Sequence, residues 1–541
     1  MDKPFAITLD PGSSLANHTG SWRTNRPVYV DRLPPCNNAC PAGEDIQGWL
    51  FHAESGDYEK AWRALTQNNP LPATMGRVCY HPCEDSCNRA QIDLPVGINS
   101  VERFLGDEAI KQGWALPKPT LSSGKRVLVV GAGPSGLSAA YHLARLGHAV
   151  ELHDAGPFAG GMMRFGIPKY RLPREVLDAE VKRITDMGVV LKLNTKVDNI
   201  EQSMKAGGFD AAFLAVGAHI GKRAHIPAGA ATKILDAVSV LRSMEGEEKP
   251  LLGRRVAVYG GGNTAFDVAR TAKRLGASEA IIVYRRTREK MPAHDSEIEE
   301  AVQEGILIKW LSTIKQAGEG SITIEKMALD AKGFPQPTGE FETLEADSVV
   351  LALGQDVDLG LLEGVTGLAV KDGVVTVGPN MMTGHPGIFA GGDMVPSERT
   401  VTVAVGHGKK AARHIDGWLR NQPYQAAPKH ELANFEKLNP WYYSEAPHQV
   451  RPTLDIVRRQ STFEEVSGGL DEKTALFEAR RCLSCGNCFE CDNCYGVCPD
   501  NAVVKLGAGL RFKFNYDYCK GCGVCVTECP CGAIKMVPEE I

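Results

Sequence analysis

Short apolar runs that end in glycine mark the middle of the chain. Residues 125–130, KRVLVV, lead directly into Gly131, and a second run of the same kind, RRVAVYG, begins at Arg254. Each run has the length and composition of a buried strand, and helical spacing of apolar residues follows each glycine segment. Two shorter runs, FLAVG at 213–217 and VLALG at 350–354, also end in glycine. The pattern predicts two strand–glycine–helix units of the α/β class, one nested inside the other.

The flanking segments have different patterns. In residues 31–114 the apolar positions Ile46, Trp49, Leu50 and Ala53 fall at helical spacing, which predicts a helical domain. In the rest of the chain, proline, glycine and charged residues mark the expected loops and segment boundaries. From this punctuation we expect an extended arm (1–30), a linker (115–124), a connector that packs over the preceding domains or tethers the last one (421–478) and a cysteine-rich module (479–541).

Composition and charge exclude several classes of protein. Sixty basic residues against 65 acidic residues give a net charge of −5, which offers no electrostatic basis for binding nucleic acid or an anionic membrane. No apolar run approaches the roughly 18 residues of a membrane span. The first residues, MDKPFAITLDPG, lack the basic and apolar stretches of a signal peptide. We therefore expect a soluble, cytoplasmic protein.

The first glycine segment is Gly131-Ala-Gly133-Pro134-Ser135-Gly136, which has the GxGxxG spacing of a dinucleotide-binding loop. Gly131 permits the tight turn, Gly133 lets the backbone approach a pyrophosphate, and Gly136 lets the helix lie close to the strand. The phosphates then lie at a helix N-terminus, where unpaired N–H groups favour an anion. Asp154 ends the next predicted strand and can accept hydrogen bonds from a ribose. These residues predict a dinucleotide site, with a structural glycine turn as the alternative.

The second glycine segment is Gly260-Gly-Gly262-Asn263-Thr264-Ala265, with alanine in the third glycine position, as the pattern permits. Its second strand ends in Arg285 and Arg286, where the first unit has an acidic residue. A guanidinium at this point suits a 2′-phosphate, so the sequence favours NADP over NAD. A solvated basic turn is the alternative interpretation.

The cysteines fall into two groups, five between Cys36 and Cys87 and eleven between Cys482 and Cys531. Such clusters in a large chain indicate metal binding and not a disulfide framework. Two C-terminal runs have the spacing of bacterial two-cluster ferredoxins, in which the fourth cysteine of each run ligates the other cluster. One 4Fe-4S cluster is therefore expected on Cys488, Cys491, Cys494 and Cys529, and the other on Cys519, Cys522, Cys525 and Cys498. Zinc is the disfavoured alternative, and we interpret Cys482, Cys485 and Cys531 as non-ligands because no complementary ligand is apparent.

Taken in order, these motifs resemble the two-dinucleotide flavoproteins of the disulfide-reductase-like fold, and within them the small subunit of glutamate synthase. The resemblance covers roughly residues 33–415 and rests on GAGPSG, AGGMMRFGIPKYRLP at 159–173, GGGNTA, YRR followed by MPA, and AGGD. It extends to the N-terminal half of dihydropyrimidine dehydrogenase and to electron-bifurcating NADH–ferredoxin:NADP reductases. It implies FAD on a domain of residues 125–225 and 355–420, with NADP or NAD on an inserted domain of residues 226–354. It also implies cofactor contacts from Gly161, Arg164, Gly392 and Asp393.

The same resemblance implies a 4Fe-4S cluster in the helical domain. Matched position by position, its ligands are Cys40, Cys79, Cys83 and, in place of a fourth cysteine, Glu102. Relatives with two clusters carry an additional upstream CxxC, which this chain lacks, so we expect one cluster here and three in the chain. Glu102 as an ordinary helix residue stays open, as does its replacement as ligand by Cys36 or Cys87.

The motifs together predict an electron-transfer subunit that exchanges electrons between NAD(P)(H) and a catalytic partner through FAD and 4Fe-4S clusters. A 2-oxoacid:acceptor oxidoreductase is one such partner. A glutamate synthase small subunit and a stand-alone NAD(P)H:ferredoxin oxidoreductase are the alternatives, and an iron–sulfur carrier with a vestigial flavin site is disfavoured by the intact glycine segments. The chemistry requires no side chain as general base, because the cofactors carry the hydride and the electrons.

Overall fold

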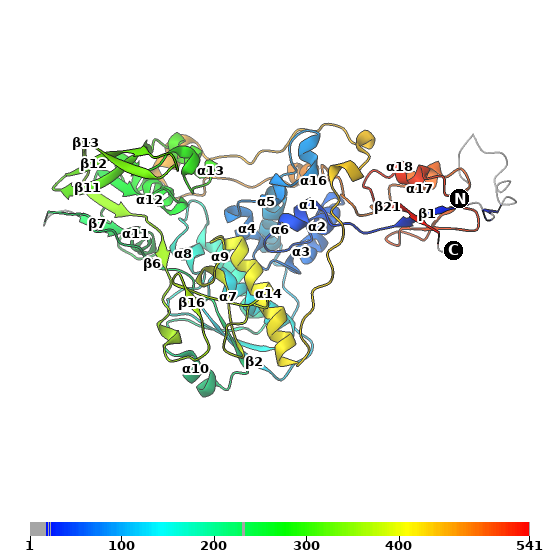
Figure 1. Cartoon of the computed structure of the whole chain (residues 1–541), viewed down its shortest axis with the longest axis horizontal. Coiled ribbons are helices and arrows are strands. Elements are labelled where there is room, and N and C mark those ends of the chain that lie inside the picture. Colours follow the sequence, from blue (N-terminus) through cyan, green and yellow to red (C-terminus); the bar gives the residue numbers. More distant parts are fainter. Residues whose placement is uncertain (1–17, 20, 22, 230–232, 540–541) are drawn as a thin grey trace.

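The computed structural model describes residues 18, 19, 21, 23–229 and 233–539 and contains two five-stranded parallel sheets, one in the lower part of Figure 1 and one at its left. The first sheet has the order β18 (Ile388–Ala390), β5 (Ala211–Leu214), β2 (Arg126–Val130), β3 (Ala149–His153), β4 (Val190–Lys192). The second has the order β10 (Leu307–Lys309), β9 (Glu279–Val283), β8 (Arg255–Tyr259), β14 (Ser348–Leu351), β7 (Lys233–Asp236). Because the second set lies between β5 and β18 in sequence, one α/β domain is inserted into the other, as predicted.

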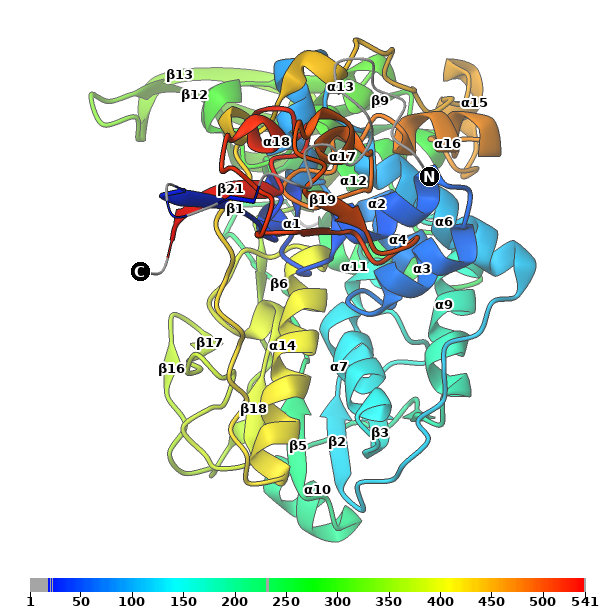
Figure 2. The same ribbon diagram turned by 90° about the vertical axis from the view of Figure 1, so that its right-hand side faces the viewer.

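Helices cover these sheets where the apolar spacing predicts them. After β2, helix α7 (Pro134–Arg145) packs beside α14 (Val401–Leu419) on the first sheet, and the two lie side by side in Figure 2. Helix α12 (Asn263–Arg274) follows β8 in the same way. The remaining helices of these domains are α8 (Met162–Phe165), α9 (Arg174–Asp186), α10 (Ile200–Gly207), α11 (Ala237–Ser243) and α13 (Asp295–Gln303).

Short antiparallel strands complete the two α/β domains. A three-stranded sheet extends from the inserted domain and consists of β11 (Ser312–Gly318), β12 (Ser321–Leu329) and β13 (Pro335–Glu345). The two-stranded pairs are β6 (Ile220–Gly221) with β15 (Gln355–Asp356), and β16 (Val370–Lys371) with β17 (Val374–Val375).

The helical domain at the N-terminal side packs against the first α/β domain. Its helices are α1 (Pro35–Ala39), α2 (Ile46–Glu54), α3 (Tyr58–Thr66), α4 (Pro72–Val78), α5 (Pro82–Asp85) and α6 (Ile98–Gln112). All four positions that predicted a helix, Ile46, Trp49, Leu50 and Ala53, are buried on α2. Figure 1 shows this domain between the first α/β domain and the C-terminal module.

The C-terminal module includes a strand from the N-terminal side of the chain. Its elements are α17 (Asn493–Val497), β19 (Val503–Lys505), β20 (Phe512–Phe514), α18 (Val524–Thr527) and β21 (Ile534–Pro538). Strand β1 (Asn25–Tyr29) pairs with β21, and the Tyr29 ring stacks on Phe514 with centroids 4.6 Å apart. The expected extended arm therefore includes a strand of this module, while residues 1–17, 20 and 22 of the arm lie outside the described residues.

The connector packs over the inserted α/β domain and over the helical domain. Helix α15 (Ile456–Ser461) contacts α12, and α16 (Glu472–Ala479) contacts α2 and α6. In the inserted domain, the buried carboxylate of Glu304 receives hydrogen bonds from Arg270 and Arg274 at 2.7–3.0 Å, and from Arg459 of α15 at 3.2 Å. Within the described residues, no helix is long and apolar enough to cross a membrane.

Candidate functional site

The first glycine loop has the geometry that a dinucleotide requires. A Cβ on Gly131, at φ +102°, would lie 2.3 Å from the carbonyl oxygen of Ala215, and one on Gly136 would lie 1.8 Å from the oxygen of Gly131. Both positions therefore exclude any side chain. Pro134 begins α7, where its missing N–H removes no helical hydrogen bond. The loop delivers the N-terminus of α7 to the carboxyl end of β2, as a phosphate site needs.

An unpaired buried hydroxyl fits FAD at this loop. Ser135 Oγ, in the first turn of α7, is buried and has no hydrogen-bond partner within the described residues. Gly392 lies so close that a Cβ on it would be 3.1 Å from Ser135 Cβ, and a Cβ on Gly161 would be 2.7 Å from the Cα of Gly133. The loops around residues 133, 161 and 392 thus converge without side chains. A phosphate here would satisfy the hydroxyl and the free N–H groups of the helix.

The polar residues predicted around FAD have different surroundings. Both oxygens of Asp154 accept backbone hydrogen bonds of 2.7 Å, from Ala132 of the glycine loop and from Gly156. Arg164 is buried, donates 2.8 Å to the carbonyl of Ala159 and pairs with Asp178, so its guanidinium is engaged by protein groups. Burial raises the pKa of Asp393, which follows Gly392. Asp154 keeps acceptor capacity for a ribose, and a cofactor contact by Arg164 stays a prediction.

The second glycine loop is open where a pyrophosphate would approach. A Cβ on Gly260 would meet the carbonyl oxygen of Ala352 at 2.2 Å, whereas one on Gly262 would meet nothing within 4 Å. Asn263 and Thr264 begin α12 and accept hydrogen bonds from His294 N (3.0 Å) and Gln355 Nε2 (3.5 Å), respectively. Ala265 is completely buried, as expected where helix packs on strand.

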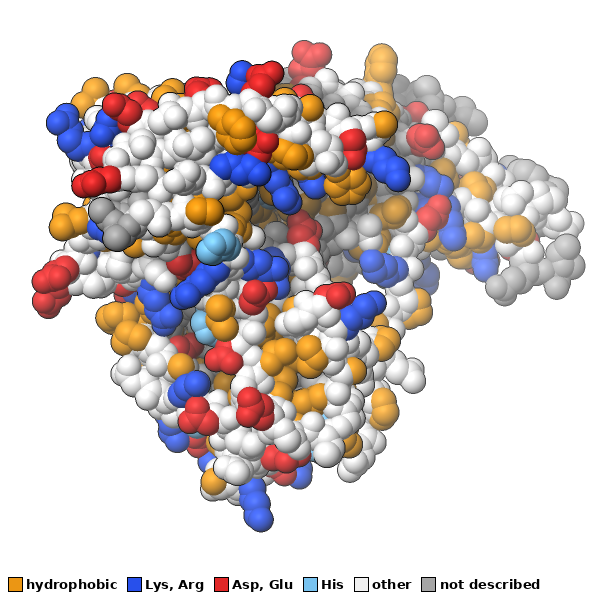
Figure 3. Space-filling view, turned by 60° about the vertical axis from the view of Figure 1, so that its left-hand side comes forward, with side chains coloured by type: hydrophobic (Ala, Val, Ile, Leu, Met, Phe, Trp, Pro, Cys, Tyr) orange, Lys and Arg blue, Asp and Glu red, His pale blue; other side chains and the backbone are white. Residues whose placement is uncertain are grey.

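The arginines after β9 differ in their partners. Arg285 is exposed, and the buried Arg286 Nε has no hydrogen-bond partner within the described residues. Arg288, by contrast, forms ion pairs of 3.3–3.4 Å with Asp295 and Glu299. On the face of the molecule drawn in Figure 3, Lys and Arg side chains surround a hollow between the upper and lower parts of the view. Within the described residues neither Arg285 nor Arg286 forms an ion pair, although the Arg286 guanidinium lies over the Phe334 ring, 5.8 Å from its centroid. Guanidinium groups at the strand end suit a 2′-phosphate.

The four predicted ligands of the helical domain come together. Cys40 ends α1, Cys79 ends α4, Cys83 lies on α5 and Glu102 lies on α6. Burial is the largest cause of the raised pKa of each of these cysteines, and the charge of Glu102 raises all three further. Burial also raises the pKa of Glu102. The charge of Glu102 thus acts on all three cysteines, which agrees with the ligand set expected from the resemblance.

Sequence reasoning missed two residues at this site. Glu44 is buried and shares Asn69 with Glu102, since the amide donates 2.9 Å to each carboxylate. The charge of Glu44 acts on Cys40 and Cys79, whereas that of Glu102 also acts on Cys83. Glu44 has the stronger effect on Cys40 and Glu102 the stronger effect on Cys79, so both carboxylates lie near the predicted ligands. The hydroxyl of Thr402, from α14, donates 3.1 Å to Cys79 Sγ, a contact that no sequence spacing signals.

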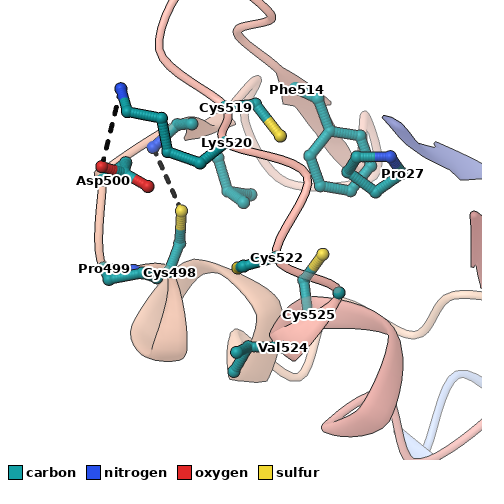
Figure 4. A pocket seen from close by; sticks show the side chains of 13 residues that line it. Pro27, Cys498, Pro499, Asp500, Phe514, Cys519, Lys520, Cys522, Val524 and Cys525 are labelled. Carbon is teal, nitrogen blue, oxygen red and sulfur yellow. Dashed lines mark hydrogen bonds and ion pairs between the residues drawn. The ribbon is translucent and has the colours of Figure 1, made fainter. Parts of the chain in front are cut away.

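The cysteines of the C-terminal module form two sets that agree with crossed ligation. Burial raises the pKa of Cys494 to about 11, and three neighbouring sulfurs add to the rise: Cys488, Cys491 and Cys529. The other set consists of Cys498, Cys519, Cys522 and Cys525, which line one pocket. Figure 4 shows sulfurs of this set directed toward one another. In each set, three cysteines of one run meet the fourth cysteine of the other.

Three cysteines predicted as non-ligands have defined positions. Cys531 Sγ lies 3.8 Å from Cys529 Sγ. Cys482 and Cys485 lie away from the C-terminal module sets and line a pocket with Cys36 and Cys87. Among the described residues no group of three or more His, Cys, Asp or Glu forms a site for a single metal ion. The thiolates of a 4Fe-4S cluster bind different irons, so cluster sites are more widely spaced than sites for one ion.

Comparisons with known proteins agree with this arrangement. Residues 110–408 match the family model of pyridine nucleotide-disulphide oxidoreductases. Residues 24–114 match dihydropyrimidine dehydrogenase domain II, 4Fe-4S cluster, and residues 512–535 match a 4Fe-4S binding domain. The first match covers more than half of the chain.

Curated relatives match across most of the chain. The beta subunit of an NADP(+)-dependent formate dehydrogenase from Moorella thermoacetica is 36% identical over 83% of this chain and 70% of its own. The beta subunit of an NADPH-Fe(3+) oxidoreductase from Geobacter sulfurreducens is 32% identical over 84% and 76%. The small chain of glutamate synthase [NADPH] from Escherichia coli is 32% identical over 71% and 89%. The chain is a member of the pyridine nucleotide-disulphide oxidoreductase family, an NAD(P)(H)-dependent electron-transfer flavoprotein with 4Fe-4S clusters.

Proposed function

We propose that this chain is the nicotinamide-linked subunit of a larger oxidoreductase and exchanges electrons between NADP(H) and a catalytic partner. Its own site would hold FAD on the first glycine loop and NADP(H) on the second. Three 4Fe-4S clusters follow from the ligand sets predicted from the sequence, one in the helical domain and two in the C-terminal module.

The contact between the flavin domain and the helical domain carries the proposal. Thr402 of α14 donates a hydrogen bond to Cys79 Sγ, and buried Lys409 of the same helix lies 2.8 Å from the carbonyl of Gly43. Burial lowers the pKa of Lys409 to about 8. A helix that forms part of the FAD fold thus also forms part of the wall of the first cluster site. Such direct packing is what passage of electrons between the two requires.

The residues of the chain bind and orient the cofactors, and the reaction requires no side chain as general base. FAD, when bound, supplies the conversion between a two-electron hydride and single electrons. The bare backbone at Gly131 and Gly260 holds each dinucleotide at a helix N-terminus, and Ser135 offers its hydroxyl to phosphate. Arg285 and Arg286 select the 2′-phosphate of NADP(H). The three thiols and Glu102 hold the first cluster away from water.

The relatives support a catalytic partner subunit. Two of the three described above are named as beta subunits, one of a formate dehydrogenase and one of an Fe(3+) oxidoreductase. A 2-oxoacid:acceptor oxidoreductase, expected from the motifs, is a partner of the same kind, since each supplies or consumes electrons at its own active site. A glutamate synthase small subunit is less well supported, because that match leaves 29% of this chain without a counterpart.

Purification from the native source under anaerobic conditions tests the proposal. We expect the chain to co-purify with a catalytic subunit, and the complex to bleach its flavin and reduce its clusters on addition of NADPH. Addition of the partner's reduced substrate should then reduce NADP+. A chain that purifies alone and reduces ferredoxin directly would favour the stand-alone reductase, and glutamine-dependent activity of the complex would favour glutamate synthase.

A further inference from the structure

Four cysteines from three distant parts of the chain line one pocket. Cys36 lies on α1, Cys87 follows α5, and Cys482 and Cys485 lie in the loop after α16. The pocket is lined on its other sides by Leu50, Val96 and Ile98, among others. Cys36 and Cys87 were unassigned in the sequence, and Cys482 and Cys485 lacked a complementary pair. In the folded chain, Cys36 and Cys87 lie in the same pocket as Cys482 and Cys485.

The Cys482–Cys485 loop has the backbone of a cluster-binding loop. Ser484 has φ +48°, a conformation rare for a residue with a side chain, and its N–H donates 3.4 Å to Cys482 Sγ. The predicted cluster loops that begin at Cys79, Cys488 and Cys519 share this geometry. In each, the residue two positions after the cysteine has positive φ and donates its N–H to that sulfur: His81, Glu490 and Gly521.

The four thiols also lie close enough to influence one another. Burial raises the pKa of Cys36, and the charges of Cys482, Cys87 and Cys485 raise it further. Burial raises the pKa of Cys485 to about 11, while the side-chain amide of Asn88 donates 3.3 Å to its sulfur. Four thiols that converge in a mostly apolar pocket, each with at least one N–H donor, have the surroundings that iron–sulfur clusters use.

We infer that Cys36, Cys87, Cys482 and Cys485 bind a further 4Fe-4S cluster, which joins the helical-domain cluster to the C-terminal module. The relay role rests on the proposed function, whereas the ligand set does not. Cys36 and Cys40 are four residues apart at the two ends of α1, about 6 Å along a helix. Cys485 and Cys488 are three residues apart, at most about 11 Å of extended chain. The new site is therefore adjacent to the sites on both sides of it.

The number of clusters can be tested by measuring iron and acid-labile sulfide in the full-length holoprotein, purified anaerobically. Four clusters predict about sixteen irons per FAD, whereas the three clusters expected from the sequence give about twelve. A count of about twelve in a preparation with full FAD overturns the inference. Spin quantitation after full reduction gives the same count without any variant, so the inference stays testable if the variants fold poorly.

Single and double replacements then test the ligands. Cys36→Ala, Cys482→Ala and the double variant should each lose the same four irons and the same EPR component, because any missing ligand disrupts one shared cluster. Ser484→Ala keeps all four thiols and should keep all irons. If the cysteines only fill space in the core, the variants will retain the wild-type iron content, which would refute the ligand set.

Electron flow separates failure of this inference from failure of the proposed function. In Cys482→Ala we expect NADPH to reduce the flavin at the wild-type rate, while reduction of the C-terminal clusters slows at least tenfold. Unchanged cluster reduction would contradict the relay role. A wild-type protein with sixteen irons that does not react with NADP(H) would refute the proposed function and leave the cluster in place.

Discussion

Replacement of Arg285 and Arg286 by alanine should weaken NADPH binding and leave NADH binding nearly unchanged. Arg286 Nε is buried and unpaired within the described residues, and Arg285 is exposed at the same strand end. A charge-assisted hydrogen bond contributes roughly 1.5–3 kcal/mol, so its loss should reduce NADPH affinity about 10- to 150-fold. Because Arg285 is exposed, we expect its contribution to the NADPH binding free energy to lie at the lower end of this range. NADH lacks the 2′-phosphate and therefore loses no such contact.

The assay is titration of the purified holoprotein with NADPH and with NADH, followed by flavin reduction at saturating cofactor. Arg288→Ala is the matched control, because this arginine already pairs with Asp295 and Glu299 and should change either affinity less than threefold. Equal losses for both cofactors in the double variant would mean that the arginines bind the pyrophosphate or maintain the fold. A wild-type preference for NADH would also refute the reasoning.

Three further changes test other parts of the molecule. Glu102→Ala should leave the helical-domain cluster labile or with three irons, while FAD and the C-terminal clusters stay bound. Glu44→Gln is the control and should keep the full cluster; iron analysis and EPR distinguish the two variants. Cys529→Ser should remove the cluster held by the earlier C-terminal run, and loss of the cluster of its own run would disprove crossed ligation. Burial opposes ionisation of Glu304, but hydrogen bonds from Arg274 and neighbouring arginines lower its pKa to about 2. Glu304→Gln should therefore destabilise the protein by about 3 kcal/mol, measured as a lower urea midpoint at pH 7. The stability difference between wild type and variant should reach its maximum above the ordinary carboxyl pKa of 4.5. It should disappear as the pH falls toward 2, where Glu304 becomes protonated in the folded protein.

Local patterns predicted the parts of the fold that depend on local sequence. The glycine loops at Gly131 and Gly260 could be recognised because steric exclusion of a side chain is a property of a few adjacent residues. The crossed cysteine sets followed from spacing alone. By contrast, the pairing of β1 with β21 joins segments more than 500 residues apart, and the five residues of β1 carry no alternation that indicates a strand.

Distant pairings also explain what spacing could not assign. Cys482 and Cys485 had no evident partners because the complementary thiols of Cys87 and Cys36 lie 395 and 446 residues before Cys482, on segments that only the folded chain brings to the same pocket. Thr402 was missed for the same reason, since it reaches Cys79 from α14, 323 residues later in the chain. Glu44 was missed although it lies four residues after Cys40, because no spacing rule marks it.

The pairing of β1 with β21 restricts how the C-terminal module can move. The module is covalently attached through the loop after α16 at one side and held through β1 at the other, and residues 30–35 then lead directly into α1. With two attachments it cannot swing outward as a ferredoxin-like shuttle on a single tether does. Clusters bound in this module would instead exchange electrons with a redox partner that docks at a fixed surface. Fusion or truncation that displaces residues 25–29 would uncover the edge of β21. On the proposed function, it would weaken electron exchange with the partner while flavin reduction by the nicotinamide continues.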